Sequence, residues 1–135
     1  MFPLLSIWSD WGILLLRVVF GLVFIVHGWP KIRNWGETAR NFEAMGFRPG
    51  RVLSPVVAAV EFFGGIALVA GLWTQFAAVL LLGQLLVILV WKFKNGEKFV
   101  GGWEFDLVLL AVAALFFVLG GGAFALDHTL TFGGL

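Results

Sequence analysis

Cysteine and tyrosine are absent from the 135 residues, and only 13% of the residues are charged. Without thiols, the chain by itself forms no disulfide, no thiolate metal site and no iron-sulfur cluster. A soluble domain has about a quarter of its residues charged, so this chain cannot cover itself with a water-compatible surface. A net charge of +1 gives no concentrated basic surface, which argues against a nucleic-acid partner.

Apolar residues dominate instead, at 61% of the chain with a mean hydropathy of +1.01. Crossing a bilayer takes about 20 apolar residues per helix. Four such stretches occur at about 11–29, 52–72, 76–91 and 103–119. Tryptophan, which favours the membrane interface, marks their ends at Trp11, Trp29, Trp73, Trp91 and Trp103. The sequence therefore predicts one all-α domain over residues 1–135, an integral membrane four-helix bundle.

The first stretch is too long for the core of a signal peptide, and no Lys or Arg precedes it. A cleaved leader is therefore not expected.

A short amphipathic helix is predicted between the first two spans, at about 35–45. Its apolar residues fall on one helical face: Trp35, Ala39, Phe42 and Met45. Asn34 and Glu37 have the spacing of an N-cap and its returning carboxylate, and Gly46 suits a C-terminal stop. We expect this helix to lie in the membrane interface. A plain polar loop is the alternative.

Basic residues are divided unevenly between the two ends of the predicted bundle. Eight lie at the end opposite the termini, and none lies outside the spans at the other end: Lys31, Arg33, Arg40, Arg48, Arg51, Lys92, Lys94 and Lys98. Cytoplasmic loops accumulate Lys and Arg, so both termini are predicted on the non-cytoplasmic side.

Six polar residues fall inside the predicted spans, where exposure to lipid is costly, so we expect them to face the bundle interior. Counting 1.5 Å per residue from the span ends divides them into two tiers. The middle tier contains Arg17, Glu61 and Gln84, and the inner tier contains His27, Glu104 and Asp106.

In the middle tier, an Arg guanidinium can bind a carboxylate with two parallel hydrogen bonds, so an Arg17–Glu61 pair is predicted. The pair has two interpretations: a structural clasp between the first two spans, or a binding or proton-handling site at mid-membrane.

The inner tier is also open to two interpretations. His27 is either an exposed or capping residue near the interface, or a group that passes protons to Asp106 or Glu104. His27 and His128 lie at opposite ends of the predicted bundle, which excludes a bis-His haem within one chain. Metal-binding spacings of His or Cys are missing, so no metal site is predicted.

Ordered sequence blocks along nearly the whole chain resemble the DoxX family of small bacterial membrane proteins. The blocks are RVVFG at 17–21, HGWPK at 27–31, MGF at 45–47, EFFGG at 61–65, GLWT at 71–74, WEFDL at 103–107 and ALD at 125–127. Departures from the family pattern are Arg48 after the MGF block, Ala125 in place of a common Ser, and Asp106 where Asn is frequent. The resemblance implies a four-helix protein of the bacterial cytoplasmic membrane.

Some members of that family are linked to quinone reduction or oxidative stress, so the resemblance implies a quinone-linked redox role. Such a chain would be an accessory or substrate-site subunit that takes its electrons from a partner protein or a bound cofactor, with no cofactor of its own and a membrane quinone as ligand. Candidate catalytic residues are Arg17, Glu61, His27 and Asp106, and candidate ligand-binding residues are Arg17, His27, Gln84 and Glu104. The alternatives are a non-enzymatic membrane scaffold with an Arg17–Glu61 clasp, and a small-solute transporter that works as a homo-oligomer.

Overall fold

A computed structural model describes residues 3–132, except the side chains of residues 3, 4 and 132, and within this range all regular secondary structure is helical. The helices are α1 (Pro3–Arg33), α2 (Trp35–Ala44), α3 (Gly50–Ala70), α4 (Thr74–Lys94), α5 (Glu104–Leu119) and α6 (Leu126–Phe132). A loosely wound turn, Phe99–Trp103, leads into α5.

Four of the described helical segments are long and apolar enough to cross a membrane: Leu5–Arg33, Gly50–Ala70, Thr74–Lys94 and Phe99–Leu119. Their outward faces carry large apolar side chains, such as Val26, Phe63 and Val118, which are 68%, 63% and 73% exposed. Apolar surface of this extent suits contact with lipid. The prediction of a four-span helical membrane protein is therefore confirmed.

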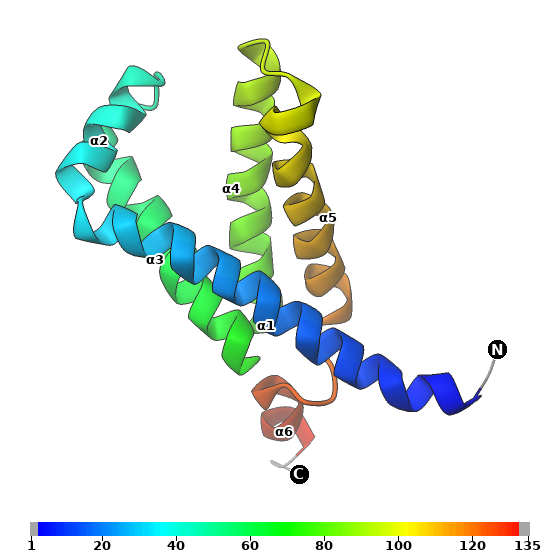
Figure 1. The fold of residues 1–135 in the computed structure, drawn as a ribbon. Helices are drawn as coiled ribbons and strands as arrows, with labels where there is room; N and C mark the ends of the chain where they lie inside the picture. Colours follow the sequence, from blue (N-terminus) through cyan, green and yellow to red (C-terminus); the bar gives the residue numbers. More distant parts are fainter. Residues whose placement is uncertain (1–2, 133–135) are drawn as a thin grey trace.

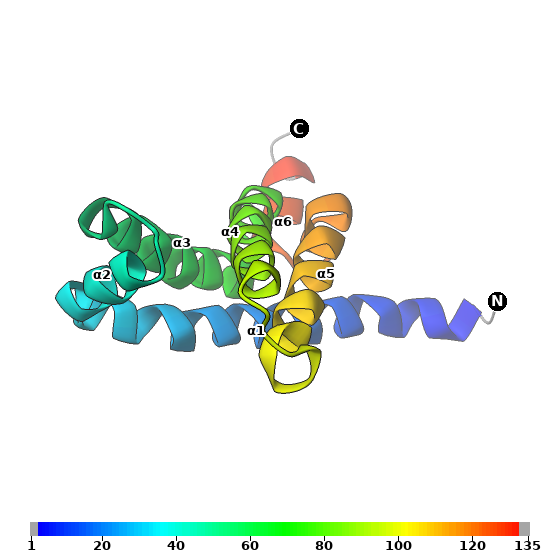
Figure 2. The ribbon, with the colours of Figure 1, turned by 90° about the horizontal axis from the view of Figure 1, so that it is seen from above.

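The spans form two antiparallel pairs, α1 with α3 and α4 with α5 (Figure 1). Seen from above, α1 runs past α3, α4 and α5 along one side of the molecule (Figure 2). The α2 helix and the α4–α5 connection lie at one end of the molecule, which we call the basic end, and α6 lies at the other (Figure 1).

Two glycines allow α1 and α3 to approach closely. A Cβ added to Gly21 would lie 2.6 Å from the carbonyl oxygen of Gly65, and one added to Gly65 would lie 2.6 Å from that of Gly21. Small residues promote such backbone contact in membrane helices. This contact fixes the register of the two helices.

Apolar residues from all four spans fill the centre of the bundle: Phe20, Phe24, Leu68, Ala77, Ala78, Leu81, Leu85, Leu109, Ala113 and Phe116. Between the basic end and α6, this core holds the two helix pairs together.

The α2 helix occupies the position predicted at about 35–45, so that prediction is confirmed. The expected N-cap at Asn34 is not. Asn34 makes no side-chain capping hydrogen bond. Gly46 has a φ of +91° and follows the last turn, as expected of a helix stop. Whether α2 lies along the membrane interface stays a prediction.

The α6 helix follows the four spans and was not predicted from the sequence. Its Asp127 accepts hydrogen bonds from the backbone N–H groups of Trp73 (2.6 Å) and Thr74 (2.8 Å). The N–H of Asp127 in turn donates to the carbonyl oxygen of Gly71 at 2.9 Å. Asp127 therefore caps the start of α4 from more than 50 residues away and fastens α6 to the α3–α4 turn.

A polar cavity between the helix pairs

A cavity of about 450 Å³ opens between the two helix pairs toward the basic end. Small-molecule sites in proteins usually measure about 300–1,000 Å³ and carry a few convergent polar groups on apolar walls. Its polar lining residues are His27, Lys31, Thr38, Asn41, Glu61, Gln84, Lys92 and Asp106, and its apolar ones include Phe24, Phe42, Met45, Leu85 and Phe105. The cavity therefore has the size and lining of a ligand site.

One wall of the cavity holds an ion pair between Lys31, in the last turn of α1, and Glu61, in the middle of α3. The Lys31 ammonium lies 2.7 and 2.6 Å from the two oxygens of Glu61. Gln84 of α4 donates a further hydrogen bond to Glu61 from the opposite pair of helices. The carboxylate is thus shared between both halves of the bundle, and its side chain is only 7% exposed.

The other wall holds a second ion pair, between Lys92 of α4 and Asp106 of α5. The Lys92 ammonium lies 2.6 Å from Asp106 and also donates to the carbonyl oxygen of Gly102 at 3.3 Å. The two lysine side chains, Lys31 and Lys92, are 30% and 27% exposed, so both keep donor capacity facing the open cavity.

His27 lies on the same wall as Lys31, one helical turn before it, and is exposed. Its ring packs obliquely near Phe105 of α5, with centroids 6.5 Å apart. Within residues 3–132, no protein group hydrogen-bonds to its ring nitrogens, so a ligand in the cavity has access to them. Two ammonium groups, an imidazole and an amide can donate to ligand oxygens here, while two carboxylates can accept protons.

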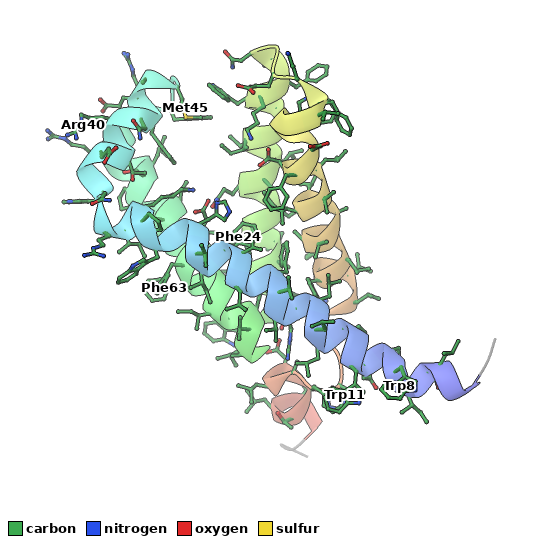
Figure 3. The ribbon with its side chains drawn as sticks, viewed as in Figure 1. Trp8, Trp11, Phe24, Arg40, Met45 and Phe63 are labelled. Carbon is green, nitrogen blue, oxygen red and sulfur yellow. The ribbon has the colours of Figure 1, made fainter. Side chains whose placement is uncertain are left out.

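Trp91 positions α2 beside the cavity. Its indole N–H donates to the carbonyl oxygen of Met45, just after α2, at 2.9 Å. Met45 points into the space between α2 and α4, whereas Arg40 of α2 points away from it (Figure 3). The hydrogen bond from Trp91 therefore fixes the end of α2 across the opening between the helix pairs.

The predicted Arg17–Glu61 bond is wrong. Arg17 is 1% exposed and donates to the carbonyl oxygen of Phe124 at 3.2 Å, while Asp127 attracts it electrostatically. The register of α1 and α3 explains the difference, since Gly28 faces Glu61 and Gly71 faces Arg17. Arg17 and Gly28 are separated by about 16 Å along α1, at 1.5 Å per residue.

Of the other predicted polar groups, His27, Glu61, Gln84 and Asp106 meet at the cavity, whereas Glu104 is not among its lining residues. The Glu104 carboxylate accepts a hydrogen bond from the N–H of Gly101 at 2.9 Å, which closes the turn before α5.

Lys31 and Lys92 line the cavity, although they were not among the candidate site residues predicted from the sequence. A helical-spacing signal was present for both. Lys31 follows His27 by four residues, and Lys92 follows Gln84 by eight, so each pair shares one face of its helix. Long lysine side chains near helix ends can extend well away from their backbone, and here they reach into the bundle.

Together, the four spans and the polar cavity between them define a multi-pass helical membrane protein with a candidate ligand site. The sequence model of the DoxX family matches residues 12–94, and the chain belongs to this family. No solved structure matches the chain.

Two curated relatives cover most of the chain. The chain is 35% identical over 120 residues to "Putative oxidoreductase CatD" of Bacillus subtilis strain 168. The aligned segment covers 86% of this chain and 84% of the relative. The chain is 32% identical over 124 residues to "Inner membrane protein YqjF" of Escherichia coli strain K12, covering 90% of this chain and 94% of the relative. The protein is therefore a multi-pass bacterial inner membrane protein of the DoxX family.

Proposed function

We propose that this protein is a quinone-binding subunit of a redox system in the bacterial cytoplasmic membrane. The observation that carries the proposal is the cavity with an ammonium–carboxylate pair on each wall, Lys31–Glu61 and Lys92–Asp106. Further support comes from the family and from the name of the B. subtilis relative, which describes an oxidoreductase.

A quinone head has two carbonyl oxygens on opposite sides of a flat ring. Donors on two opposed walls match this pattern, with Lys31 and His27 on one side and Lys92 on the other. Phe24 and Phe105 supply aromatic surface for the ring. Hydrogen bonds to the oxygens strengthen as the ring gains electrons, so the same donors favour the reduced form.

Reduction of a quinone to a quinol consumes two electrons and two protons. In this proposal, Glu61 and Asp106 relay protons to the two oxygens through their paired lysines or His27. The electrons come from a partner redox protein or a bound cofactor, since the chain has no cysteine for thiol or cluster chemistry. In this scheme the protein provides the substrate site, and the partner provides the reducing power.

The orientation in the membrane belongs to the same proposal. With the eight basic residues on the cytoplasmic side, the cavity faces the cytoplasm and both termini face outward. Fusions of a cytoplasm-dependent and a periplasm-dependent reporter to the C-terminus test this orientation. Activity of the periplasm-dependent reporter alone is expected, and activity of the cytoplasm-dependent one would reverse the topology.

The quinone site is tested by ligand-dependent thermal unfolding of the purified protein with a series of ubiquinone-like and menaquinone-like compounds. We expect a quinone-dependent rise in Tm that disappears in the double variant Lys92→Met/Asp106→Leu. Removing both partners avoids leaving one buried charge unpaired. The matched control is Lys94→Met/Glu97→Leu, which removes the same charges from exposed positions beside the cavity.

The control is expected to keep the full quinone-dependent shift. A stable, folded protein that shows no shift with any quinone would overturn the proposed function and favour a scaffold role.

A further inference from the structure

A second, apolar groove of about 250 Å³ lies between α3 and α4, next to the polar cavity. Its walls are formed by Leu53 and Val57 of α3, Gly83 and Val87 of α4, and Phe47 of the α2–α3 connection. Leu53 and Val87 are 36% and 53% exposed, so the groove opens on the lipid-facing surface of the bundle. It is therefore a lateral opening on the apolar surface of the bundle.

The groove and the polar cavity adjoin each other. Both are lined by the same five residues: Phe42, Met45, Val57, Gln84 and Ile88. Gln84 occupies the junction, with its amide directed to Glu61 in the cavity. A molecule with a polar head in the cavity and a flexible apolar chain can thus occupy both spaces at once.

Gly83 keeps the groove open. It is exposed, and a Cβ added there would have no atom within 4 Å. Glycine in the middle of a helix lowers helix stability relative to alanine, and no close helix contact here compensates for that loss. A larger side chain at this position would project into the groove without displacing the backbone.

We propose that the groove between α3 and α4 is the tail site and lateral portal for the quinone, holding its hydrocarbon chain while the ring lies in the polar cavity. The inference rests on the proposed function and assigns the α3–α4 side as the route from the bilayer. A tail that leaves lipid for a protein groove gains little from the hydrophobic effect, because both surroundings are apolar. The groove therefore contributes space rather than affinity. A quinone with a tail can place its ring in the cavity only if its tail can lie in the groove.

Gly83→Leu tests the tail site by filling the groove. The matched control is Gly12→Leu on α1, an exposed helical glycine that also has no atom within 4 Å of an added Cβ. Two fully substituted benzoquinones serve as probes, one with only methyl groups and one with a ten-carbon tail. Affinities are measured in detergent by quenching of tryptophan fluorescence, and folding of each variant is checked by circular dichroism.

We expect Gly83→Leu to weaken the tailed quinone at least tenfold and to leave the tail-less quinone within twofold of the unaltered protein. Gly12→Leu should change neither affinity. Equal weakening of both probes, or an unchanged affinity for the tailed probe, would overturn the tail site. If the unaltered protein binds neither probe, the proposed function fails, and the tail site fails with it. This outcome differs from the two above, in which the unaltered protein binds quinone but the tail site is overturned.

Discussion

Removing one or the other charge of the Lys31–Glu61 pair should lower the free energy of unfolding by unequal amounts. Lys31→Met leaves the Glu61 carboxylate, 7% exposed, with Gln84 as its remaining side-chain donor in the described part of the chain. Leaving a buried charge without its partner costs about 3–5 kcal/mol, and we expect about 3 kcal/mol because Gln84 still donates. Glu61→Leu leaves an ammonium that is 30% exposed and can turn to water, so about 1 kcal/mol is expected.

The double variant Lys31→Met/Glu61→Leu is expected to unfold within about 1 kcal/mol of the unaltered protein, since replacing both members of a buried pair by apolar residues is often neutral. The coupling energy between the two positions should then be about 3 kcal/mol. Unfolding free energies are measured by titrating mixed micelles with denaturing detergent and following helicity by circular dichroism.

The same three variants distinguish a structural pair from a functional one. If the pair only holds α1 against α3, the double variant should regain both stability and quinone binding. The proposed function predicts restored stability without restored binding. Additive effects of the two single substitutions, with no coupling, would refute the reasoning about the pair itself.

Two further predictions concern the packing that positions the cavity. Asp127→Ala should destabilise the protein by about 2–3 kcal/mol, because two charge-assisted hydrogen bonds at the start of α4 are lost, and Asp127→Asn by less, because one acceptor oxygen remains. Thermal unfolding of the two variants side by side checks the order, and equal stability of the alanine variant and the unaltered protein would contradict the cap. Gly65→Ala should cost about 1–3 kcal/mol, since its Cβ would press on the Gly21 carbonyl, whereas Gly64→Ala should be neutral or stabilising, since its nearest neighbour is 3.7 Å away. The same unfolding assay compares these neighbouring positions, and a reversed order would show that the α1–α3 contact is not as close as described.

The polar residues show which parts of the candidate site could be predicted from the sequence. Glu61, Gln84, Asp106 and His27 were identified because polar groups inside apolar spans must face the bundle interior, and all four line the cavity. Their partners were not identified, because depth counting treats each span as upright and as starting at its predicted end. Helix α1 begins at Pro3 and crosses the bundle at an angle (Figure 1), so equal counts do not mean equal depths.

The four spans, the α2 helix and the uneven distribution of basic residues could be predicted from the sequence alone. Hydropathy, helical periodicity and charge placement are local properties, and the bilayer requires each spanning helix to satisfy its own backbone. The tertiary structure was needed to show that Glu61 binds Lys31 rather than Arg17, that Asp127 caps α4, and that an apolar groove lies beside the polar cavity. These features depend on how helices are rotated and shifted against one another, and the close contact of Gly21 with Gly65 sets that register for α1 and α3.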